Sequence, residues 1–210
     1  MSKTPFYVVS DFISQKTCDY LVSSSGVTEP NEDPEGRPAL TKQYLDEHCE
    51  TLLYNRLQEV LPEIEAHYGF KTRGVESMEF SWMPEACVDG GEVRCGNAVF
   101  VRKQWMKNKD RDFAVHLFLS SFNDATDETF DPDLEVYGGK LQFPQYKFSF
   151  NPKAGTAIVH PAGPHFIHAD SPVIAGDLFY VTFYISSEGP HIYQPTDYPG
   201  DYTTWFADIE

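Results

Sequence analysis

The stretch HADSPVIAGDLFYVTFYI, residues 168–185, indicates the fold of this chain. It is rich in aromatic and β-branched residues, which favour strands, and Gly176 with Asp177 gives a turn signal in its middle. Five earlier segments have the same character: MEFSWMP (78–84), NAVFVRKQW (97–105), FAVHLFLSSF (113–122), KLQFPQYKFSFNP (140–152) and TAIVHPA (156–162). Such a series of short strands separated by turns predicts an antiparallel sandwich or barrel.

The N-terminal third of the chain has a different pattern. Residues 6–14 predict a short strand, and Ser14 is a candidate N-cap for a helix that follows it. Residues 26–40 are rich in Pro, Gly and acidic residues, which predicts a loop. Over residues 41–68 apolar side chains recur at steps of three and four, which predicts a helix that Pro62 kinks or divides. The fold class is therefore mainly β with N-terminal helices (α+β), the helices packing on the sheet.

We divide the chain into three parts. Residues 1–70 supply the strand and helices, residues 71–187 supply the β core, and residues 188–210 form an acidic tail with five aromatic residues. The tail is either a strap whose aromatic side chains fill grooves on the same domain or an arm that binds a partner.

The net charge of the chain is strongly negative. It has 16 Lys and Arg against 32 Asp and Glu, a formal net charge of -16. Such a surface repels phosphate backbones and anionic lipids, so direct nucleic-acid binding is disfavoured. We also expect no membrane association and no secretion, because the sequence has no long apolar run and no signal peptide, which favours the cytoplasm. The cysteines are not closely spaced and are expected to be free thiols: Cys18, Cys49, Cys87 and Cys95.

The order of the strand segments resembles a known family. Residues 5–22, PFYVVSDFISQKTCDYLV, are similar to the opening strand and helix of prolyl-4-hydroxylase-like members of the 2-oxoglutarate and Fe(II)-dependent oxygenase family. Four later segments resemble the strands of the family's double-stranded β-helix, one after another: RDFAVHLFLSSF (111–122), EVYGGKLQFP (135–144), FSFNPKAGTAIVHPA (148–162) and residues 168–185. The resemblance covers nearly the whole chain and implies a jelly-roll, cupin-like barrel for residues 71–187.

The resemblance also implies where iron ligands should be. In that family two histidines and one carboxylate bind Fe(II) and leave positions for 2-oxoglutarate and oxygen. His168 takes the place of the second histidine, and His165 is a competitor that fits the spacing less well. The first histidine and the aspartate fall on Arg94 and Gly96, and only the following Asn97 is retained. An arginine has no lone pair for iron and a glycine has no side chain, so two of the three ligands are missing.

The anchor for 2-oxoglutarate is missing as well. The family has a basic residue nine or ten positions after the second histidine, where this chain has Asp177 and Leu178. An aspartate there would repel a carboxylate at ~4 Å by on the order of 1 kcal/mol. Phe118 stands where relatives often have a tyrosine.

Other basic residues are candidate anion anchors. They are Lys103, Lys140 and Arg111. For Arg111 we favour a structural pair with the adjacent Asp112 at the barrel rim.

A rearranged site is the alternative. His116 shares the inner face of its strand with Phe118, so His116, His168 and a nearby carboxylate could form a metal site. A lone inward histidine can equally be a hydrogen-bonded core residue. Cys95 is expected to face away from the site. Arg94 could instead pair with a buried acid or with the neighbours of His168.

Two hypotheses follow. In the first, the chain is a catalytically degenerate member of the family that acts as a binding or structural module, with a protein partner or a second copy contacting the acidic surface and the tail. Because the resemblance extends to compact members encoded by bacteria and tailed phages, a virion or assembly component is one setting. In the second, the chain is an active prolyl-hydroxylase-like dioxygenase with a non-standard metal site, and Fe(II) and 2-oxoglutarate are its cofactors only in that case.

Overall fold

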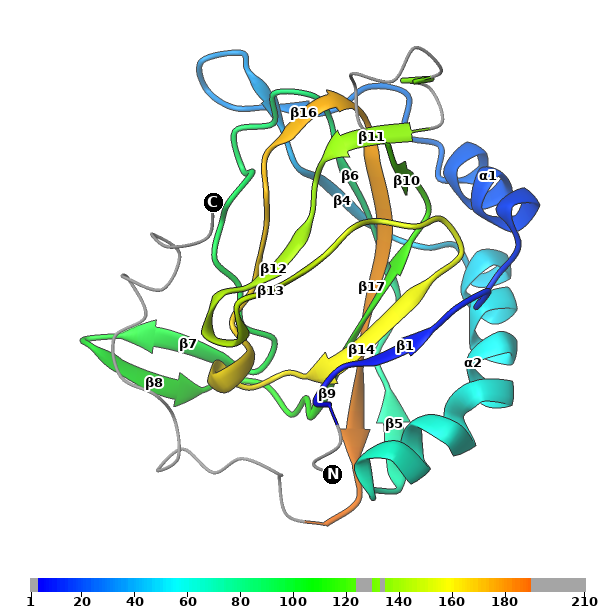
Figure 1. The fold of residues 1–210 in the computed structure, drawn as a ribbon, viewed down its shortest axis with the longest axis vertical. Coiled ribbons are helices and arrows are strands. Elements are labelled where there is room, and N and C mark those ends of the chain that lie inside the picture. The colour runs from blue at the N-terminus through cyan, green and yellow to red at the C-terminus, as the bar shows by residue number, and fades with distance from the viewer. Residues whose placement is uncertain (1–3, 124–129, 133–134, 190–210) are drawn as a thin grey trace.

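The computed structural model describes residues 4–123, 130–132 and 135–189. A seven-stranded antiparallel sheet, here called the large sheet, forms the centre of the molecule (Figure 1). Its strand order is β1 (Tyr7–Val9), β14 (Ala157–Pro161), β9 (Phe113–Phe118), β17 (Leu178–Ser187), β6 (Glu79–Met83) and β4 (Thr41–Tyr44), with β5 (Thr72–Val75) also paired to β17. The strands of the N-terminal part therefore complete the sheet at both of its edges.

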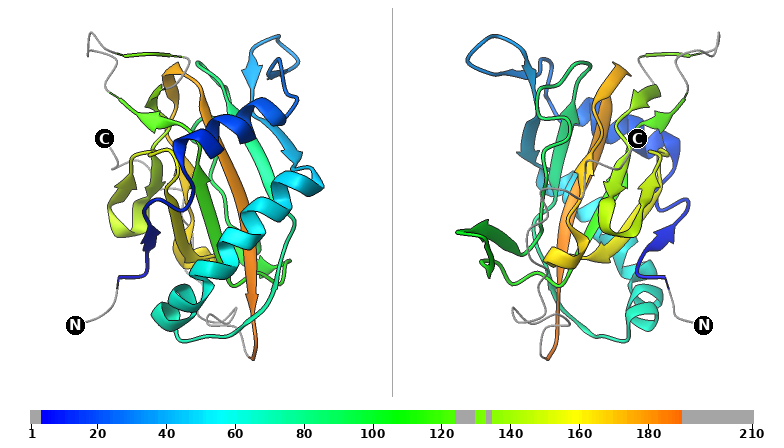
Figure 2. Two further views of the ribbon diagram at one scale, coloured as in Figure 1. Left: turned by 90° about the vertical axis from the view of Figure 1, so that its right-hand side faces the viewer. Right: turned by 60° about the vertical axis from the view of Figure 1, so that its left-hand side comes forward.

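Two smaller sheets lie against one face of the large sheet and close the barrel (Figure 2). One contains β10 (Ser121–Phe122), β11 (Glu135–Gly138) and β16 (Val173–Gly176), and the other contains β13 (Phe148–Phe150), β12 (Leu141–Phe143) and β15 (Ala169–Asp170). Short 3-10 turns cover Pro144–Tyr146 and Pro164–Phe166. The predicted fold class, a jelly-roll barrel with helices packed on one sheet, is confirmed.

Two helices cover the other face of the large sheet (Figure 2, left). Helix α1 (Gln15–Ser24) begins as predicted, because the Ser14 hydroxyl accepts a hydrogen bond from the Thr17 N–H at 3.2 Å. Helix α2 (Glu47–Tyr68) begins at Asp46, whose carboxylate accepts from the Cys49 N–H at 2.7 Å. Capping side chains of this kind satisfy N–H groups that have no partner within the helix.

Alternation along β17 separates two cores. Val181, Phe183 and Ile185 point toward the helices and are fully buried in an apolar cluster with side chains of α1 and α2. Leu178 and Tyr180 point into the barrel, where a second cluster forms. The candidate site lies on the barrel side.

The structure corrects the extent of the helix predicted for residues 41–68. Thr41–Tyr44 is strand β4, paired with β6 so that Thr41 faces Trp82. The three- and four-residue spacing of apolar side chains continued by coincidence across this strand, while the N-cap at Asp46 marks the true start. Pro62 lies within one continuous helix on its exposed side, so the predicted division is wrong.

Four further segments differ from prediction. KLQFPQYKFSFNP is not one strand but the paired strands β12 and β13, because the 3-10 turn at Pro144–Tyr146 and the positive φ of Lys147, 48°, reverse the chain. NAVFVRKQW is not one strand but a hairpin of β7 (Ala98–Val101) and β8 (Gln104–Lys107), because Arg102 and Lys103 both adopt positive φ, 51° and 63°, and reverse the chain. The loop at 26–40 contains a short pairing of β2 (Asn31–Glu32) with β3 (Pro38–Ala39). The strand predicted over residues 6–14 ends at Val9, and Asp11 has a positive φ of 55°.

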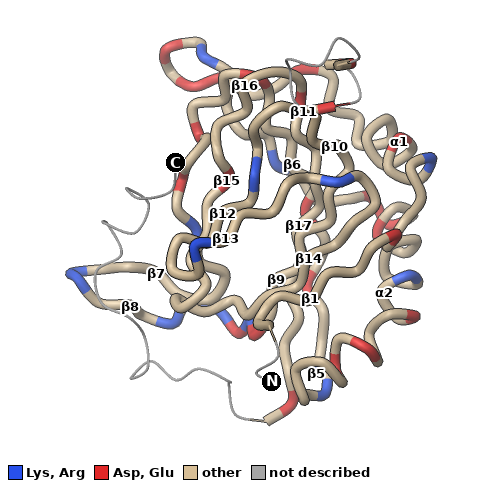
Figure 3. The backbone as a smooth tube through the Cα atoms, in the orientation of Figure 1, with Lys and Arg blue, Asp and Glu red and all other residues tan. Residues whose placement is uncertain are grey.

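Acidic residues are spread over the helices and the loops (Figure 3). Among the described residues, neither helix is both long and apolar enough to cross a lipid bilayer. Residues 190–210, most of the predicted aromatic tail, lie outside the described residues, so its role as a strap or an arm stays a prediction.

Candidate functional site

Three histidines meet inside the barrel. His116 is on β9, His160 is on β14, and His168 immediately precedes β15. The register places Ile158 opposite His116 and Ala114 opposite His160, so the two imidazoles are diagonal neighbours on the inner face. The three ring centroids are 4.9 to 5.2 Å apart, and no ring is more than 3% exposed.

Backbone carbonyls orient two of these imidazoles. His160 Nδ1 lies 2.8 Å from the carbonyl oxygen of Pro161, and His168 Nδ1 lies 3.0 Å from that of Phe166. A carbonyl only accepts, so Nδ1 carries the proton in both rings. In the neutral form Nε2 then keeps its lone pair, and this is the atom with which each ring can bind a metal.

The third imidazole is held by side chains. His116 Nε2 lies 3.1 Å from His160 Nε2, and His116 Nδ1 lies 3.3 Å from the Thr182 hydroxyl. Because His160 Nε2 has no proton, His116 Nε2 must donate in this arrangement, and the Thr182 hydroxyl must donate to His116 Nδ1.

Burial keeps all three rings neutral. Burial lowers the pKa of His160 from 6.5 to about 4. Burial, the neighbouring imidazoles and the Arg94 guanidinium hold the pKa values of His116 and His168 well below 6.5. One ring nitrogen from each histidine lies within 4.8 Å of the others, so the cluster could hold a metal ion.

Arg94 lies directly opposite His168. The two residues form an antiparallel bridge in which each N–H donates to the other's carbonyl, at 2.8 and 3.1 Å. The Arg94 guanidinium forms an ion pair with the buried carboxylate of Asp170 and donates to the Tyr180 hydroxyl at 2.8 Å. Of the two pairings expected for Arg94, the one with a buried acid is confirmed.

Gly96 sits where a side chain has no room. A Cβ atom added at Gly96 would lie 2.8 Å from a ring carbon of Tyr184 and 2.9 Å from Ala162 Cβ. The neighbouring Asn97 is buried, and its side-chain amide donates to the carbonyl of Arg111 at 2.9 Å. Asn97 therefore has a structural role.

The position of the cosubstrate anchor is apolar. Leu178 and Phe118 are both buried in the barrel cluster, and the Asp177 carbonyl accepts from the Ser120 hydroxyl at 2.9 Å. A paired cation, a crowded glycine and an apolar cluster thus occupy the positions that the resemblance assigns to iron and 2-oxoglutarate. These residues do not fit that pair of ligands.

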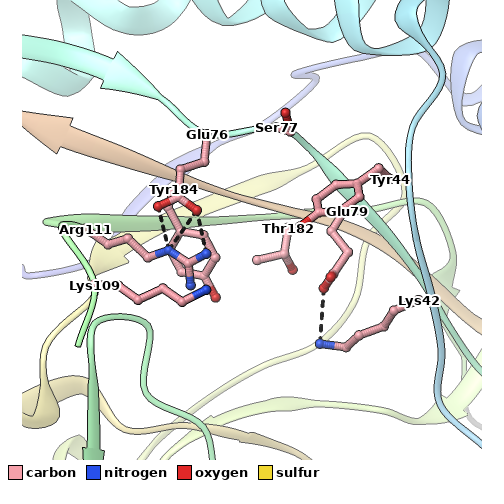
Figure 4. A pocket seen from close by; sticks show the side chains of 9 residues that line it. All are labelled: Lys42, Tyr44, Glu76, Ser77, Glu79, Lys109, Arg111, Thr182 and Tyr184. Atoms are coloured by element: carbon pink, nitrogen blue, oxygen red, sulfur yellow. Dashed lines mark hydrogen bonds and ion pairs between the residues drawn. The ribbon is translucent and has the colours of Figure 1, made fainter. Parts of the chain in front are cut away.

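A pocket of about 490 Å³ opens at the mouth of the barrel (Figure 4). Two ion pairs line it: Lys42 Nζ lies 3.1 Å from Glu79, and Arg111 Nε lies 2.7 and 2.8 Å from the two Glu76 oxygens. Figure 4 shows Lys109 extending into the same space.

Thr182 connects this pocket to the histidines. It lines the pocket and also contacts His116. The Arg111 guanidinium stacks on the ring of Tyr184, another residue that lines the pocket, at 3.7 Å from its centroid.

Several sequence candidates lie elsewhere or have other partners. Arg111 pairs with Glu76 and not with Asp112, whose carboxylate accepts from the N–H and hydroxyl of Ser187, so that prediction is wrong. Lys103 is exposed at the hairpin turn, and Lys140 lies over the Phe122 ring.

The remaining candidates are cysteines and one histidine. All four cysteines are free thiols, as predicted. Cys95 contacts the Ala162 carbonyl at 3.5 Å, and neither Cys95 nor His165 belongs to the histidine cluster.

The sequence reading missed His160. It is the fourth residue of a strand that was predicted correctly, and period-two alternation places it on the same face as Ile158. The pairing of β14 with β9, two strands more than thirty residues apart in the chain, brings it to His116.

Comparisons with known proteins show what the fold resembles. No protein-family model matches the chain, and no curated protein matches it in sequence. Among solved structures, a viral collagen prolyl hydroxylase from Paramecium bursaria Chlorella virus-1 in complex with 2OG is similar, with a TM-score of 0.57 and 17% identity over 87% of this chain and 96% of that one. A Pseudomonas putida prolyl-4-hydroxylase has a TM-score of 0.59 and 14% identity over 88% of this chain and 94% of that one.

A third similar structure is a Trichoplax adhaerens prolyl hydroxylase in complex with a peptide of the hypoxia inducible factor oxygen degradation domain. Its TM-score is 0.58, with 13% identity over 88% of this chain and 84% of that one. At these identities the likeness concerns the fold. This chain therefore has the barrel fold of the prolyl 4-hydroxylases, and the resemblance seen in its sequence is confirmed at that level.

Proposed function

We propose that this chain is a prolyl-4-hydroxylase-fold protein that does not carry out 2-oxoglutarate and Fe(II) chemistry and acts as a binding module. The main support is the Arg94–Asp170 ion pair beside His168. A guanidinium keeps its charge in a protein, so it has no lone pair with which to ligate iron. The lack of space at Gly96 disfavours the carboxylate ligand that the family has at this position.

The barrel mouth is the binding site in this proposal. Three cations, Lys42, Lys109 and Arg111, line it against two carboxylates, Glu76 and Glu79. This local excess of positive charge lies in a protein whose net charge is -16. Within the described residues, no carboxylate forms an ion pair with Lys109. A ligand that bears a carboxylate fits this arrangement, because Lys109 can supply its counter-charge.

The test of lost catalysis measures turnover. The protein is loaded with Fe(II) without oxygen, mixed with 2-oxoglutarate and oxygen, and assayed for succinate, with an active prolyl hydroxylase run in parallel. We expect no succinate above the iron-only blank. Stoichiometric or catalytic succinate formation by this chain would overturn the proposal.

The test of the pocket uses acetate, succinate and glutamate as probes in an NMR titration. We expect chemical-shift changes at residues that line the pocket, and at least roughly tenfold weaker binding in Lys109→Ala. Lys103→Ala is the matched control, because Lys103 lies on the exposed hairpin turn away from the pocket. Equal binding by the two variants would contradict the role of Lys109.

One observation favours the alternative, an active Fe(II) and 2-oxoglutarate-dependent dioxygenase with a non-standard metal site. His116 and His160 place two further imidazoles beside His168. This alternative requires succinate formation that disappears in His168→Ala, so the same assay decides between the two functions.

The proposal extends to partners and setting. The binding-module proposal includes a protein partner or a second copy of the chain, which binds through the acidic surface and the tail. It also includes a location in the cytoplasm or in a virion. Because a net charge of -16 opposes self-association at low ionic strength, a homo-oligomer should strengthen as salt is added. Light scattering on the full chain at low and high salt tests this, and a constant monomer mass would leave only a different protein as partner.

A further inference from the structure

The donor set of the histidine cluster selects a particular class of ion. Three neutral imidazoles suit zinc, cobalt, nickel, copper and iron, whereas magnesium and calcium prefer oxygen ligands. All three rings are buried and neutral, which is the protonation state that binds a metal.

The spacing of the rings is close to that of a metal site. With metal–nitrogen bonds of about 2.0–2.1 Å, two ligands of a tetrahedral ion lie about 3.3 Å apart. His116 Nε2 and His160 Nε2 lie 3.1 Å apart. Since one nitrogen from each ring lies within 4.8 Å of the others, a movement of up to about 1.5 Å by one imidazole brings all three to a single ion.

The outer hydrogen bonds are those that metal-binding histidines need. Metal-ligating histidines almost always donate their other ring N–H to a carbonyl, carboxylate or water. His160 and His168 already do so through Nδ1. For His116, rotation of the Thr182 hydroxyl from donor to acceptor lets the ring proton move to Nδ1 and leaves Nε2 available.

We infer that His116, His160 and His168 form a binding site for one zinc-class transition-metal ion, which shares a single residue with the family's iron position. Of the three ligands only His168 belongs to that position, while the other two come from β9 and β14. Asp170 is committed to Arg94 and is not a ligand. With three protein ligands, the fourth position is left to water, hydroxide or a small anion. This inference does not depend on the proposed function.

The test uses Co(II) and Zn(II) with the full, metal-free protein. We expect one equivalent of Co(II) to give the visible d–d bands of a four-coordinate ion, Zn(II) to displace it, and Mg(II) not to compete. His116→Ala, His160→Ala and His168→Ala should each weaken Co(II) binding at least about 100-fold. His48→Ala is the matched control, because His48 is exposed on α2 and far in sequence from the cluster.

A second measurement covers variants that fail to fold. In the unsubstituted protein, Zn(II) should shift the ¹⁵N signals of the three imidazoles, and the His116 proton should move from Nε2 to Nδ1. No Co(II) spectrum, a spectrum dominated by thiolate charge transfer, or unchanged binding in all three folded variants would overturn the inference. Metal binding without succinate formation supports both this inference and the proposed function, whereas absence of metal binding defeats this inference alone.

Thr182 has a defined positioning role within the same inference. Thr182→Val keeps the shape of the side chain and removes the hydroxyl, so we expect about tenfold weaker Co(II) binding with the fold intact. Thr182→Ser keeps the hydroxyl and should recover the affinity. Equal affinity in Val and Ser variants would show that the hydroxyl does not act on His116.

Discussion

The two faces of β17 make different kinds of contact. Toward the helices, Val181, Phe183 and Ile185 are fully buried among apolar side chains. Toward the barrel, Tyr180 accepts a hydrogen bond from Arg94, and Thr182 contacts a histidine. One strand thus separates a core in which packing matters from an interior in which each polar group has a particular partner.

This difference shows where the chain can change and where it cannot. An apolar core tolerates the exchange of one apolar side chain for another of similar volume, because dispersion and the hydrophobic effect are not directional. A buried polar group loses most of its stabilisation when its partner is removed, because it cannot regain water. We expect substitutions on the helix side to change stability alone, and substitutions on the barrel side to change both stability and binding.

The largest effect is expected on the helix side. Phe183→Ala removes a fully buried ring and should lower the free energy of unfolding by about 3–5 kcal/mol, measured by urea denaturation. Co(II) affinity of the folded fraction should stay unchanged. A parallel loss of affinity would show that the two faces are not independent.

The next effect concerns the buried ion pair. Asp170→Asn leaves the Arg94 charge without its partner and should cost about 3 kcal/mol of unfolding free energy. Adding Arg94→Met should recover most of that loss in a double-mutant cycle. The control is Asp110→Asn in the exposed pair with Arg73, where we expect a change below about 0.5 kcal/mol. Similar costs for the two pairs would contradict the contrast between barrel and surface.

Acid should destabilise the metal-free protein through the barrel side. The folded pKa of His160, about 4, is below its unfolded value near 6.5, so the unfolded state binds more protons between these values. Stability is fully present above pH 6.5 and is lost as the pH falls toward 4, by about 2 kcal/mol at pH 5 for His160 alone. Urea unfolding at pH 8 and pH 5 measures this. His160→Gln should reduce the difference, and an unchanged difference would assign the loss to other groups.

The smallest effect tests the crowding around Gly96. Gly96→Ala should cost about 1–3 kcal/mol, because the new methyl group meets Tyr184 and Ala162. Gly74→Ala is the control, since nothing lies within 4 Å of a Cβ there and its φ is not positive. Thermal unfolding of both variants gives the comparison, and equal midpoints would mean that the space at Gly96 adapts freely.

Much of the fold was predictable because its signals are local. Period-two alternation located β6, β9, β14 and β17, and the Ser14 cap located the start of α1. The turn at Arg102 and Lys103 was missed because neither residue is typical of positive φ. The helix start was placed too early because apolar spacing alone does not distinguish a short strand from a first helical turn.

The site was predictable only in part, because its partners are distant in sequence. His168 and the Arg94 position followed from the family resemblance, and His116 followed from strand alternation. His160 and Asp170 did not, since each acquires its role from a cross-strand neighbour that no local pattern reveals. These partners are set by how strands that are distant in sequence pair with one another, and no local pattern in a single sequence shows which strands pair.

The space around Gly96 also bears on whether an iron-binding motif could be introduced into this barrel. Placing an aspartate there requires the Tyr184 ring to move, and that ring is the surface on which Arg111 stacks. Arg111 in turn is paired with Glu76 at the barrel mouth. Introducing an iron-binding motif here therefore needs several coordinated substitutions. For protein engineering, the packing at Gly96 marks residue 184 as the first position to redesign.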